Sequence, residues 1–515
     1  MEKNRRNFLS NFATLTLATG AATGTSALMT NNSSVTSENK ATQNNNTDEI
    51  ISVKDFGAVG DGVTDDTVAI QNALKAFNDI GGKIIVPNGM RCVVGDLWVS
   101  KGVTFEGSNA QPGWDENLEK QYKNYGSALL LKENSTIHLQ AGSTLRNLLI
   151  VPNGMLFPQL NPDSWKGTAV KTQGDDAHIE YCLIMGFNQA IEALGHKRPR
   201  IKNIYFDCIN GIHVGDCWDI GVVQDCHAWS FATVANLGKT GYTDLRPGIA
   251  YLFGKGGDLR AIDNFSYGYY RGTVIDSCNG ITILNMGNDT NPKNHPHSIG
   301  MIVQGSSESV RLIDCQTAAY DDAGVIIDIT NDTPVFIQNH NCWGYMKHGI
   351  LVKKGNIIVA SSGYSTMQNG ITSGNDKSVI SIDNCNFDNI WGTVFNADKP
   401  GALWKFGKNT FSRIKGEIST GITLKTIDSA NNLVIDHNWS EFTVNGSVPI
   451  NTIMTPYAGR IIRIIFNNEI DILSGIGRQG GIRLNNNAIF HAISGSTLTL
   501  IGKDTKNWHE ISRSY

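Results

Sequence analysis

Charged residues are scarce in this chain of 515 residues, at 17% of the composition, and no basic run follows the first few positions. The formal net charge of -4 adds no positive surface. Proteins that bind nucleic acid generally carry a basic patch that meets the phosphates. We therefore expect no nucleic acid partner.

The cysteines lack a functional spacing. There are nine, an odd number, and none stands in a CxxC pair of the kind that metal sites use. This argues against a disulfide framework and predicts free thiols. His295 and His297 offer two nitrogen ligands, but no third ligand can be named beside them, so a surface loop is expected there and no metal site is predicted.

The N-terminus contains no apolar run that is long enough for a membrane anchor. Arg5 and Arg6 precede a mildly apolar stretch that reaches Met29, and this order resembles a twin-arginine export signal. We expect a signal at residues 1–30, a disordered polar linker at residues 31–49, and a secreted or periplasmic protein. The alternative is a disordered basic start.

Glycine is abundant, with 54 residues, and short apolar strands recur behind it. These starts follow one another at roughly 20 to 37 residues, a spacing typical of one coil plus loop insertions in a repeat fold. The pattern predicts strands that stack coil upon coil. The glycine-led starts are Gly211, Gly248, Gly280, Gly300, Gly324, Gly349 and Gly370.

One helix is predicted near the start of the repeats. Thr64 can cap it, and Ile70, Ala73, Leu74 and Phe77 follow at helical spacing. Two glycines then end the helix before a strand at residues 83–87.

The run DFGAVGDGVTDDTVAIQNAL at residues 55–74 resembles the opening of the pectate-lyase-like superfamily, which includes rhamnogalacturonase-like enzymes, mannuronan epimerases and phage tailspike depolymerases. This resemblance implies an all-β fold: a right-handed, single-stranded parallel β-helix at residues 50–430, capped by the helix. Residues 431–515 resemble the small β domain that ends many tailspike chains, which implies a homotrimer as one candidate assembly.

The first candidate site combines two glycine-led starts. Asp321 and Asp322 precede Gly324, and His348 precedes Gly349, so adjacent coils should bring them together. This resembles the paired Asp and the His-Gly step of polygalacturonases, which implies general acid and water activation by the Asp pair and charge tuning by His348. The Asn-Thr-Asp element of that family is missing, and an Asx turn with a surface histidine is the alternative.

A second candidate site is formed by Glu192 and His213. They hold the same position in successive repeats, so they could act as a base and its partner. An ordinary solvated cross-strand pair is the alternative.

Sugar binding favours aromatic faces beside polar groups, and a loop insertion is expected at residues 236–260 to build a binding wall. Half of the aromatic side chains could instead pack under that loop. The predicted substrate-binding residues are Tyr267, Tyr269, Tyr270, Arg271, Trp218, Trp229 and Lys353, where the lysine would face a substrate carboxylate.

These features together predict a secreted depolymerase of a capsular, exo- or pectin-like polysaccharide. Hydrolysis by the paired carboxylates is placed slightly ahead of a lyase reaction, in which His348 or His213 would be the base at a uronic acid. A non-catalytic, tailspike-like glycan-binding protein is the alternative of a different class. No cofactor is expected, with calcium as the candidate should the chain be a lyase.

Overall fold

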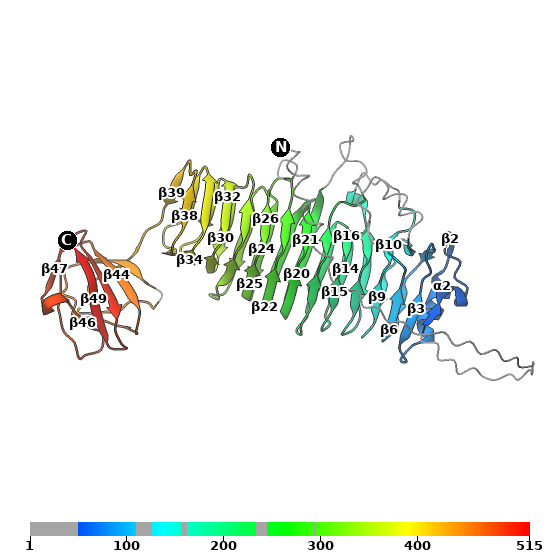
Figure 1. Cartoon of the computed structure of the whole chain (residues 1–515), viewed down its shortest axis with the longest axis horizontal. Coiled ribbons are helices and arrows are strands. Elements are labelled where there is room, and N and C mark those ends of the chain that lie inside the picture. Colours follow the sequence, from blue (N-terminus) through cyan, green and yellow to red (C-terminus); the bar gives the residue numbers. More distant parts are fainter. Residues whose placement is uncertain (1–49, 110–125, 156–161, 233–244, 292–294, 438) are drawn as a thin grey trace, which may run out of the picture. The chain divides into compact units, whose positions relative to one another are not determined.

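The computed structural model describes residues 50–109, 126–155, 162–232, 245–291, 295–437 and 439–515. The predicted signal and linker lie outside these residues. Strands stack along a parallel coil from the N-terminal blue end to the yellow segment in Figure 1. The predicted all-β parallel β-helix is thereby confirmed.

Each turn of the coil contributes strands to three faces. Faces 1 and 2 belong to one 25-stranded sheet, because the long strands β20 (Arg246–Ile262) and β22 (Tyr269–Leu284) run through both, and face 3 is a separate 14-stranded sheet. Besides β20 and β22, face 1 contains β5 (Leu97–Val99), β8 (Ile137–Leu139), β11 (Thr168–Thr172), β14 (Gln189–Leu194), β17 (Asn210–Gly215), β24 (Ile299–Gly305), β27 (Ala323–Ile329), β30 (His348–Lys354), β33 (Asn369–Ser373), β36 (Thr393–Ala397) and β39 (Glu417–Thr420).

The other two faces use shorter strands. Face 2 contains β1 (Ile50–Ser52), β3 (Gly82–Ile85), β6 (Val103–Glu106), β9 (Thr144–Arg146), β12 (His178–Glu180), β15 (Arg200–Lys202), β18 (Val222–Gln224), β25 (Glu308–Ile313), β28 (Val335–Gln338), β31 (Ile357–Ala360), β34 (Val379–Asp383) and β37 (Leu403–Phe406). Face 3 contains β2 (Asp61–Asp65), β4 (Arg91–Val94), β7 (Ala128–Leu131), β10 (Leu149–Pro152), β13 (Leu183–Met185), β16 (Tyr205–Asp207), β19 (His227–Ala228), β21 (Phe265–Tyr267), β23 (Gly287–Asp289), β26 (Gln316–Ala318), β29 (Asn341–Trp343), β32 (Gly363–Met367), β35 (Asn386–Ile390) and β38 (Thr410–Ser412).

The glycine-led starts mark one corner of the coil. A Cβ atom on Gly272, Gly300, Gly324 or Gly349 would lie 2.6 to 2.9 Å from a glycine carbonyl oxygen on the next turn, so no larger residue fits. One predicted start is wrong: Gly280 lies inside β22, and Gly272 holds the equivalent position. A sequence repeat cannot distinguish two glycines that lie eight residues apart in one long strand.

The corner between faces 2 and 3 is built from left-handed residues. Their φ values lie between 51° and 57°, a region that asparagine and aspartate enter at lower cost than other side chains. The inward neighbours of these residues include several of the nine cysteines, all of which are buried and free, as predicted. The members of this corner are Asn147, Tyr181, Asn203, Asp225, Asp263, Asn285, Asp314, Asn339, Ser361 and Asn384.

The predicted helix is present as α2 (Thr67–Ala76), with Ile70, Ala73 and Leu74 buried. It begins two residues later than expected, with Asp66 rather than Thr64 at the cap position. Thr64 belongs to β2, and Asp65 accepts the hydrogen bond of the Thr67 amide instead.

Short 3-10 turns occur at Val53–Phe56, Pro162–Ser164 and Asn485–Asn487. Among the described residues, no helix combines the length and apolar character needed to cross a membrane.

The predicted loop insertion at residues 236–260 is partly wrong. Residues 246–260 belong to β20, the longest described strand, while the remainder lies outside the described residues. Gly254, Gly256 and Gly257 lie in this part of the strand. In the coil they pack closely against neighbouring turns, where Cys217 and Asn279 carbonyl oxygens leave no room for a Cβ atom on Gly256 or Gly257.

The C-terminal strands bury a core of their own, separate from the core of the coil. Trp508 is fully buried in it and donates a hydrogen bond to the Ile453 carbonyl, 2.8 Å away. Eight strands form the main sheet: β40 (Lys425–Asp428), β41 (Asn432–Leu433), β42 (Glu441–Asn445), β43 (Thr452–Ile453), β44 (Ile461–Phe466), β46 (Gly481–Arg483), β48 (Thr497–Gly502) and β49 (Asn507–Ser514). A separate pair consists of β45 (Ile470–Ile472) and β47 (Phe490–Ala492).

Candidate active site

A groove of about 430 Å³ lies on face 1 and crosses β20, β22, β24, β27 and β30. Its floor is apolar, because Val274, Ile302 and Ile326 stand opposite one another in the strand register and point outward. Polar and charged side chains surround this floor. An apolar base with a few polar groups around it is typical of a binding site. The lining residues are Ile249, Tyr270, Arg271, Val274, His297, Ile299, Ile302, Gln304, Asp322, Ile326, Asp328 and Lys353.

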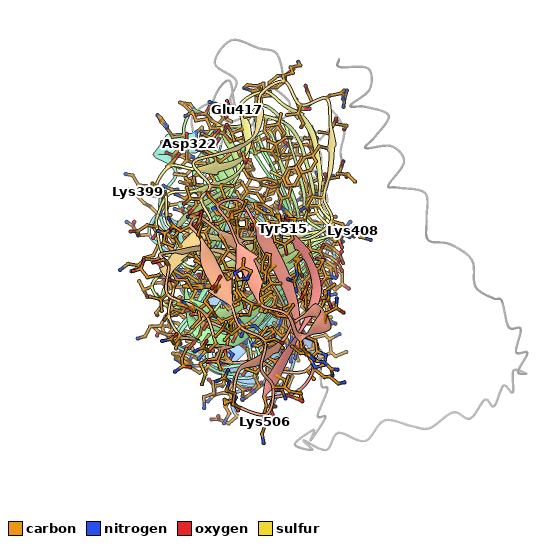
Figure 2. All side chains as sticks on the ribbon, turned by 90° about the vertical axis from the view of Figure 1, so that its left-hand side faces the viewer. Asp322, Lys399, Lys408, Glu417, Lys506 and Tyr515 are labelled. Atoms are coloured by element: carbon orange, nitrogen blue, oxygen red, sulfur yellow. The ribbon has the colours of Figure 1, made fainter. Side chains whose placement is uncertain are left out.

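The glycine corner brings three ionisable side chains together at one edge of this groove. His297, Asp322 and Lys347 stand just before β24, β27 and β30, on three consecutive turns. Asp322 Oδ1 lies 2.6 Å from Lys347 Nζ, and Asp322 Oδ2 lies 3.5 Å from His297 Nδ1. Asp322 therefore lies between a lysine and a histidine, on the outer surface of the coil (Figure 2).

The charge of Asp322 is fixed by these neighbours. Burial acts to raise its pKa, but the hydrogen bond and charge of Lys347, with a smaller contribution from His297, outweigh burial and hold the pKa below its usual value. The same hydrogen bond raises the pKa of Lys347. Both side chains are thus charged at neutral pH. Asp322 can orient the His297 ring through its Nδ1 atom, whereas Lys347 is a cation rather than a base.

Asp321 holds the backbone of the neighbouring turn. Its Oδ2 atom accepts a hydrogen bond from the His297 amide, 2.8 Å away, and its own amide donates to Ser298 Oγ. His297 has a φ of 61°, in the left-handed region, although no glycine stands there. Such a conformation persists only where surrounding contacts enforce it, and it is frequent at active sites. Asp321 thus helps to keep the exposed imidazole at the groove edge.

His297, Asp321 and Asp322 place ligand-type atoms within 4.8 Å of one another. The ammonium of Lys347 also lies 3.4 Å from Asp321. Because the Lys347 ammonium already contacts both carboxylates, a divalent cation would have to displace it, so this set fits such a cation poorly.

His348 lies one residue beyond this edge and points to the next turn. Its Nδ1 atom is 2.8 Å from Thr372 Oγ1, and it does not line the groove. Burial lowers the pKa of His348, against smaller opposing effects of Asp398 and Asp322. The predicted alignment of Gly324 with Gly349 is present in the register, but the structure places Lys347, rather than His348, against the Asp pair.

Glu192 and His213 face each other on β14 and β17, in the predicted register. Glu192 forms an ion pair of 2.8 Å with Lys171 on the preceding turn. Burial lowers the pKa of His213, opposed by Glu192 and Asp216. The register then continues through Leu252 to Val274 of the groove floor. This pair therefore lies on the same face as the groove, and its catalytic role stays a prediction.

The predicted aromatic run is divided among three environments. Tyr270 and Arg271 line the groove, with the guanidinium 5.0 Å from the ring centre. Tyr269 is fully buried and its hydroxyl donates to the Cys208 carbonyl, so it packs in the core instead of meeting a substrate. Tyr267 contacts Trp229 edge to face, in an aromatic cluster on face 3. The sequence could not separate these positions, since neighbouring residues of a strand face opposite sides.

The two remaining predicted binding residues differ in position. Lys353 on β30 lines the groove, on the side that also contains Gln304 and Asp328. Trp218 is 55% exposed, between β17 and β18, and is not among the lining residues. The sequence prediction missed Lys347 as a member of the site and treated His297 only as part of a loop. Their place just before a glycine-led strand, shared with Asp322, is the signal that could have identified both.

Residues 50–114 match the family model described as rhamnogalacturonase A/epimerase, pectate lyase-like. Together with the parallel coil, this match identifies the fold as the pectate-lyase-like β-helix. No curated protein matches the sequence.

Several solved structures are similar over most of the coil. The A-module of a mannuronan C-5 epimerase of Azotobacter vinelandii is 14% identical with a TM-score of 0.46, and the match covers 72% of this chain and 97% of that chain. DFA-IIIase of Arthrobacter chlorophenolicus without its lid is 11% identical, with a TM-score of 0.40 and coverages of 66% and 94%. The surface adhesin PfbA of Streptococcus pneumoniae is 15% identical, with a TM-score of 0.33 and coverages of 72% and 93%. At these values the likeness identifies no activity.

Proposed function

We propose that this chain is a polysaccharide depolymerase that binds a uronate-containing polymer in the face 1 groove and cleaves it by β-elimination. The observation that carries the proposal is the position of Asp322 between His297 and Lys347. Arg271 and Lys353 bring two further cations to the groove. An arginine in the groove beside a histidine that contacts a carboxylate suits proton abstraction next to a substrate carboxylate.

The reaction uses these groups in a defined order. Arg271 neutralises the uronate carboxylate, which makes the proton on the adjacent carbon more acidic. The His297 imidazole takes that proton, and Asp322 stabilises the imidazolium. The electron pair forms a carbon–carbon double bond, the bond to the glycosidic oxygen breaks, and the leaving oxygen takes a proton from water. The products are a new reducing end and an unsaturated uronide.

Hydrolysis remains the second candidate, because the side chains of Asp321 and Asp322 lie side by side as a carboxylate pair. A hydrolase needs a carboxylic acid that keeps its proton near neutral pH. The lowered pKa of Asp322 opposes that role, so the electrostatics favour elimination over the hydrolysis that the sequence placed first.

A product assay separates the two reactions. The purified chain is incubated with uronate-rich plant and bacterial polysaccharides and with a neutral glucan, while ultraviolet absorbance and product masses are followed. Elimination yields absorbing products without added water, and only from the uronate polymers. Products that are heavier by one water per cut and do not absorb would establish hydrolysis instead. Binding without cleavage on every polymer would identify a glycan-binding protein.

His297→Ala tests the assigned base. It should abolish formation of the unsaturated product, whereas His437→Ala, which changes an exposed histidine in the C-terminal part of the chain, should leave the rate unchanged. Full activity of His297→Ala would remove this residue from the mechanism.

A further inference from the structure

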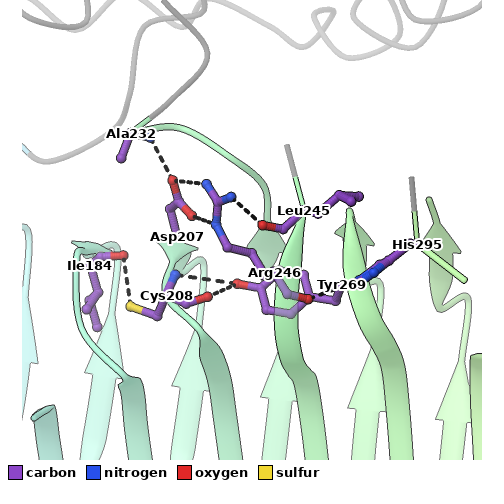
Figure 3. A network of polar contacts seen from close by, with 8 residues as sticks. All are labelled: Ile184, Asp207, Cys208, Ala232, Leu245, Arg246, Tyr269 and His295. Carbon is purple, nitrogen blue, oxygen red and sulfur yellow. Dashed lines mark hydrogen bonds and ion pairs between the residues drawn. The ribbon is translucent and has the colours of Figure 1, made fainter. Parts of the chain in front are cut away.

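A buried ion pair lies close to the groove. Arg246, the first residue of β20, and Asp207, the last of β16, have fully buried side chains joined by two hydrogen bonds of 2.6 and 3.0 Å (Figure 3). Asp207 also accepts from the Ala232 amide, and Arg246 donates to the Leu245 carbonyl. The pair thus connects a strand of face 3 with the start of a groove strand.

Such a pair is not explained by stability alone. Two charges lose their hydration on burial, and the attraction between them often does no more than offset that loss, so apolar side chains of similar size would stabilise the fold equally well. What a bidentate arginine and carboxylate supply is a fixed geometry. The start of β20 is therefore held in one position.

That position is transmitted toward the groove by contacts of the Arg246 backbone. The Arg246 carbonyl lies 3.2 Å from Nε2 of His295, a side chain that is only 8% exposed. The His295 ring meets the Tyr270 ring edge to face, with centres 5.2 Å apart. Tyr270 in turn lies beneath the guanidinium of Arg271, and both residues line the groove.

We propose that Asp207, Arg246 and His295 are positioning residues that hold Tyr270, and through it the Arg271 guanidinium, where the uronate carboxylate binds. The inference rests on the proposed function, because it assigns a carboxylate as the ligand of Arg271. It predicts that disturbing His295 weakens recognition of the substrate charge and leaves recognition of the sugar itself unchanged.

The test measures binding in the His297→Ala background, which prevents turnover. Calorimetry compares a uronate oligosaccharide with the same oligosaccharide after reduction of its carboxyl groups. His295→Leu should raise Kd for the charged ligand about tenfold and leave Kd for the neutral ligand unchanged. His295→Phe, which keeps the edge-to-face contact and loses the N–H donor, should show a smaller increase.

A general loosening of the groove would weaken the binding of both ligands equally, and that result would overturn the inference. Unchanged binding of the charged ligand would overturn it as well. Asp207→Asn leaves a buried arginine unpaired and is a poor test because the variant could fail to fold. The double variant Asp207→Leu with Arg246→Met removes both charges and keeps apolar volume. It should fold and raise Kd for the charged ligand about threefold, whereas an unchanged Kd would exclude the ion pair from positioning.

The two proposals fail in different ways. If the unaltered chain binds uronate but yields no unsaturated product, elimination is wrong while the positioning of Arg271 is still measurable. If it forms the product and His295→Leu binds the charged ligand normally, only the positioning role is wrong.

Discussion

Lys347 Nζ lies 2.6 Å from Asp322 Oδ1, although the two residues are 25 positions apart in the sequence. One turn of the coil separates them, and both stand just before a glycine-led strand. The contact gives Asp322 a lowered pKa and Lys347 a raised one, so the pair stays charged over a wide pH range. A carboxylate in this state supports a neighbouring base better than it donates a proton.

Asp322→Asn should lower kcat by about 100-fold or more, because His297 loses the charge that stabilises its protonated form. The amide is similar in size, so thermal unfolding should change little. Rates of product formation and calorimetric unfolding check both statements. Asp314→Asn is the matched control: it makes the same chemical change at a left-handed corner residue that asparagine tolerates, and it should retain full activity. Equal activity of both variants would exclude Asp322 from the reaction.

Removal of divalent cations by EDTA should leave the rate unchanged. Lys347 already forms ion pairs with Asp321 and Asp322, so a divalent cation at this place would have to displace its ammonium. The assay compares EDTA-treated chain with chain supplied with excess calcium. Loss of activity in EDTA that calcium restores would show that calcium displaces Lys347, or that it binds elsewhere.

The free energy of unfolding should fall as the pH drops from 6.5 toward 4. His340 is fully buried near Thr317, and burial lowers its pKa to about 4. Over this interval His340 binds a proton in the unfolded chain but stays neutral in the folded chain. Acid therefore favours unfolding. The cost reaches roughly 3 kcal/mol at the low end of the interval. Urea titrations at several pH values should give His340→Gln a flatter profile, and parallel profiles would contradict the assignment.

The left-handed corner can be tested by two substitutions that should change the free energy of unfolding in opposite directions. Tyr181 has a φ of 53°, where an ordinary side chain is strained, and Tyr181→Asn should stabilise the fold by about 1 kcal/mol. Asn203 occupies the next turn with a φ of 52°, and Asn203→Val should destabilise the fold by about 1 to 2 kcal/mol. Urea denaturation measures both. Two changes of the same sign would show that packing, rather than backbone conformation, governs this corner.

The repeat in the sequence predicted the coil because each turn must pack against its neighbours in the same way. Glycines at the close approach between turns recur with the turns, and this local requirement can be recognised in the sequence. The same regularity produced one error. Gly280 imitates a strand start, because composition does not report which backbone lies opposite.

The candidate site was predicted only in part. Asp321 and Asp322 could be recognised as a pair, and three of the predicted binding residues, Lys353, Tyr270 and Arg271, line the groove, while their binding role stays a prediction. Which partner meets the pair depended on side-chain direction at the corner, where Lys347 points back to Asp322 and His348 points on to Thr372. Aligning the turns by their sequences does not show in which direction each of these two adjacent side chains points.

The sequence alone determined the parallel coil, its capping helix and the free cysteines, since each depends on short-range backbone and packing preferences repeated many times. The tertiary structure alone decided that His297, Asp322 and Lys347 form one cluster, that Tyr269 is buried while Tyr270 reaches the groove, and that Asp207 and Arg246 share a buried ion pair. These relationships join residues on different turns or faces, and their geometry is set by the stacking of the turns and the direction of individual side chains.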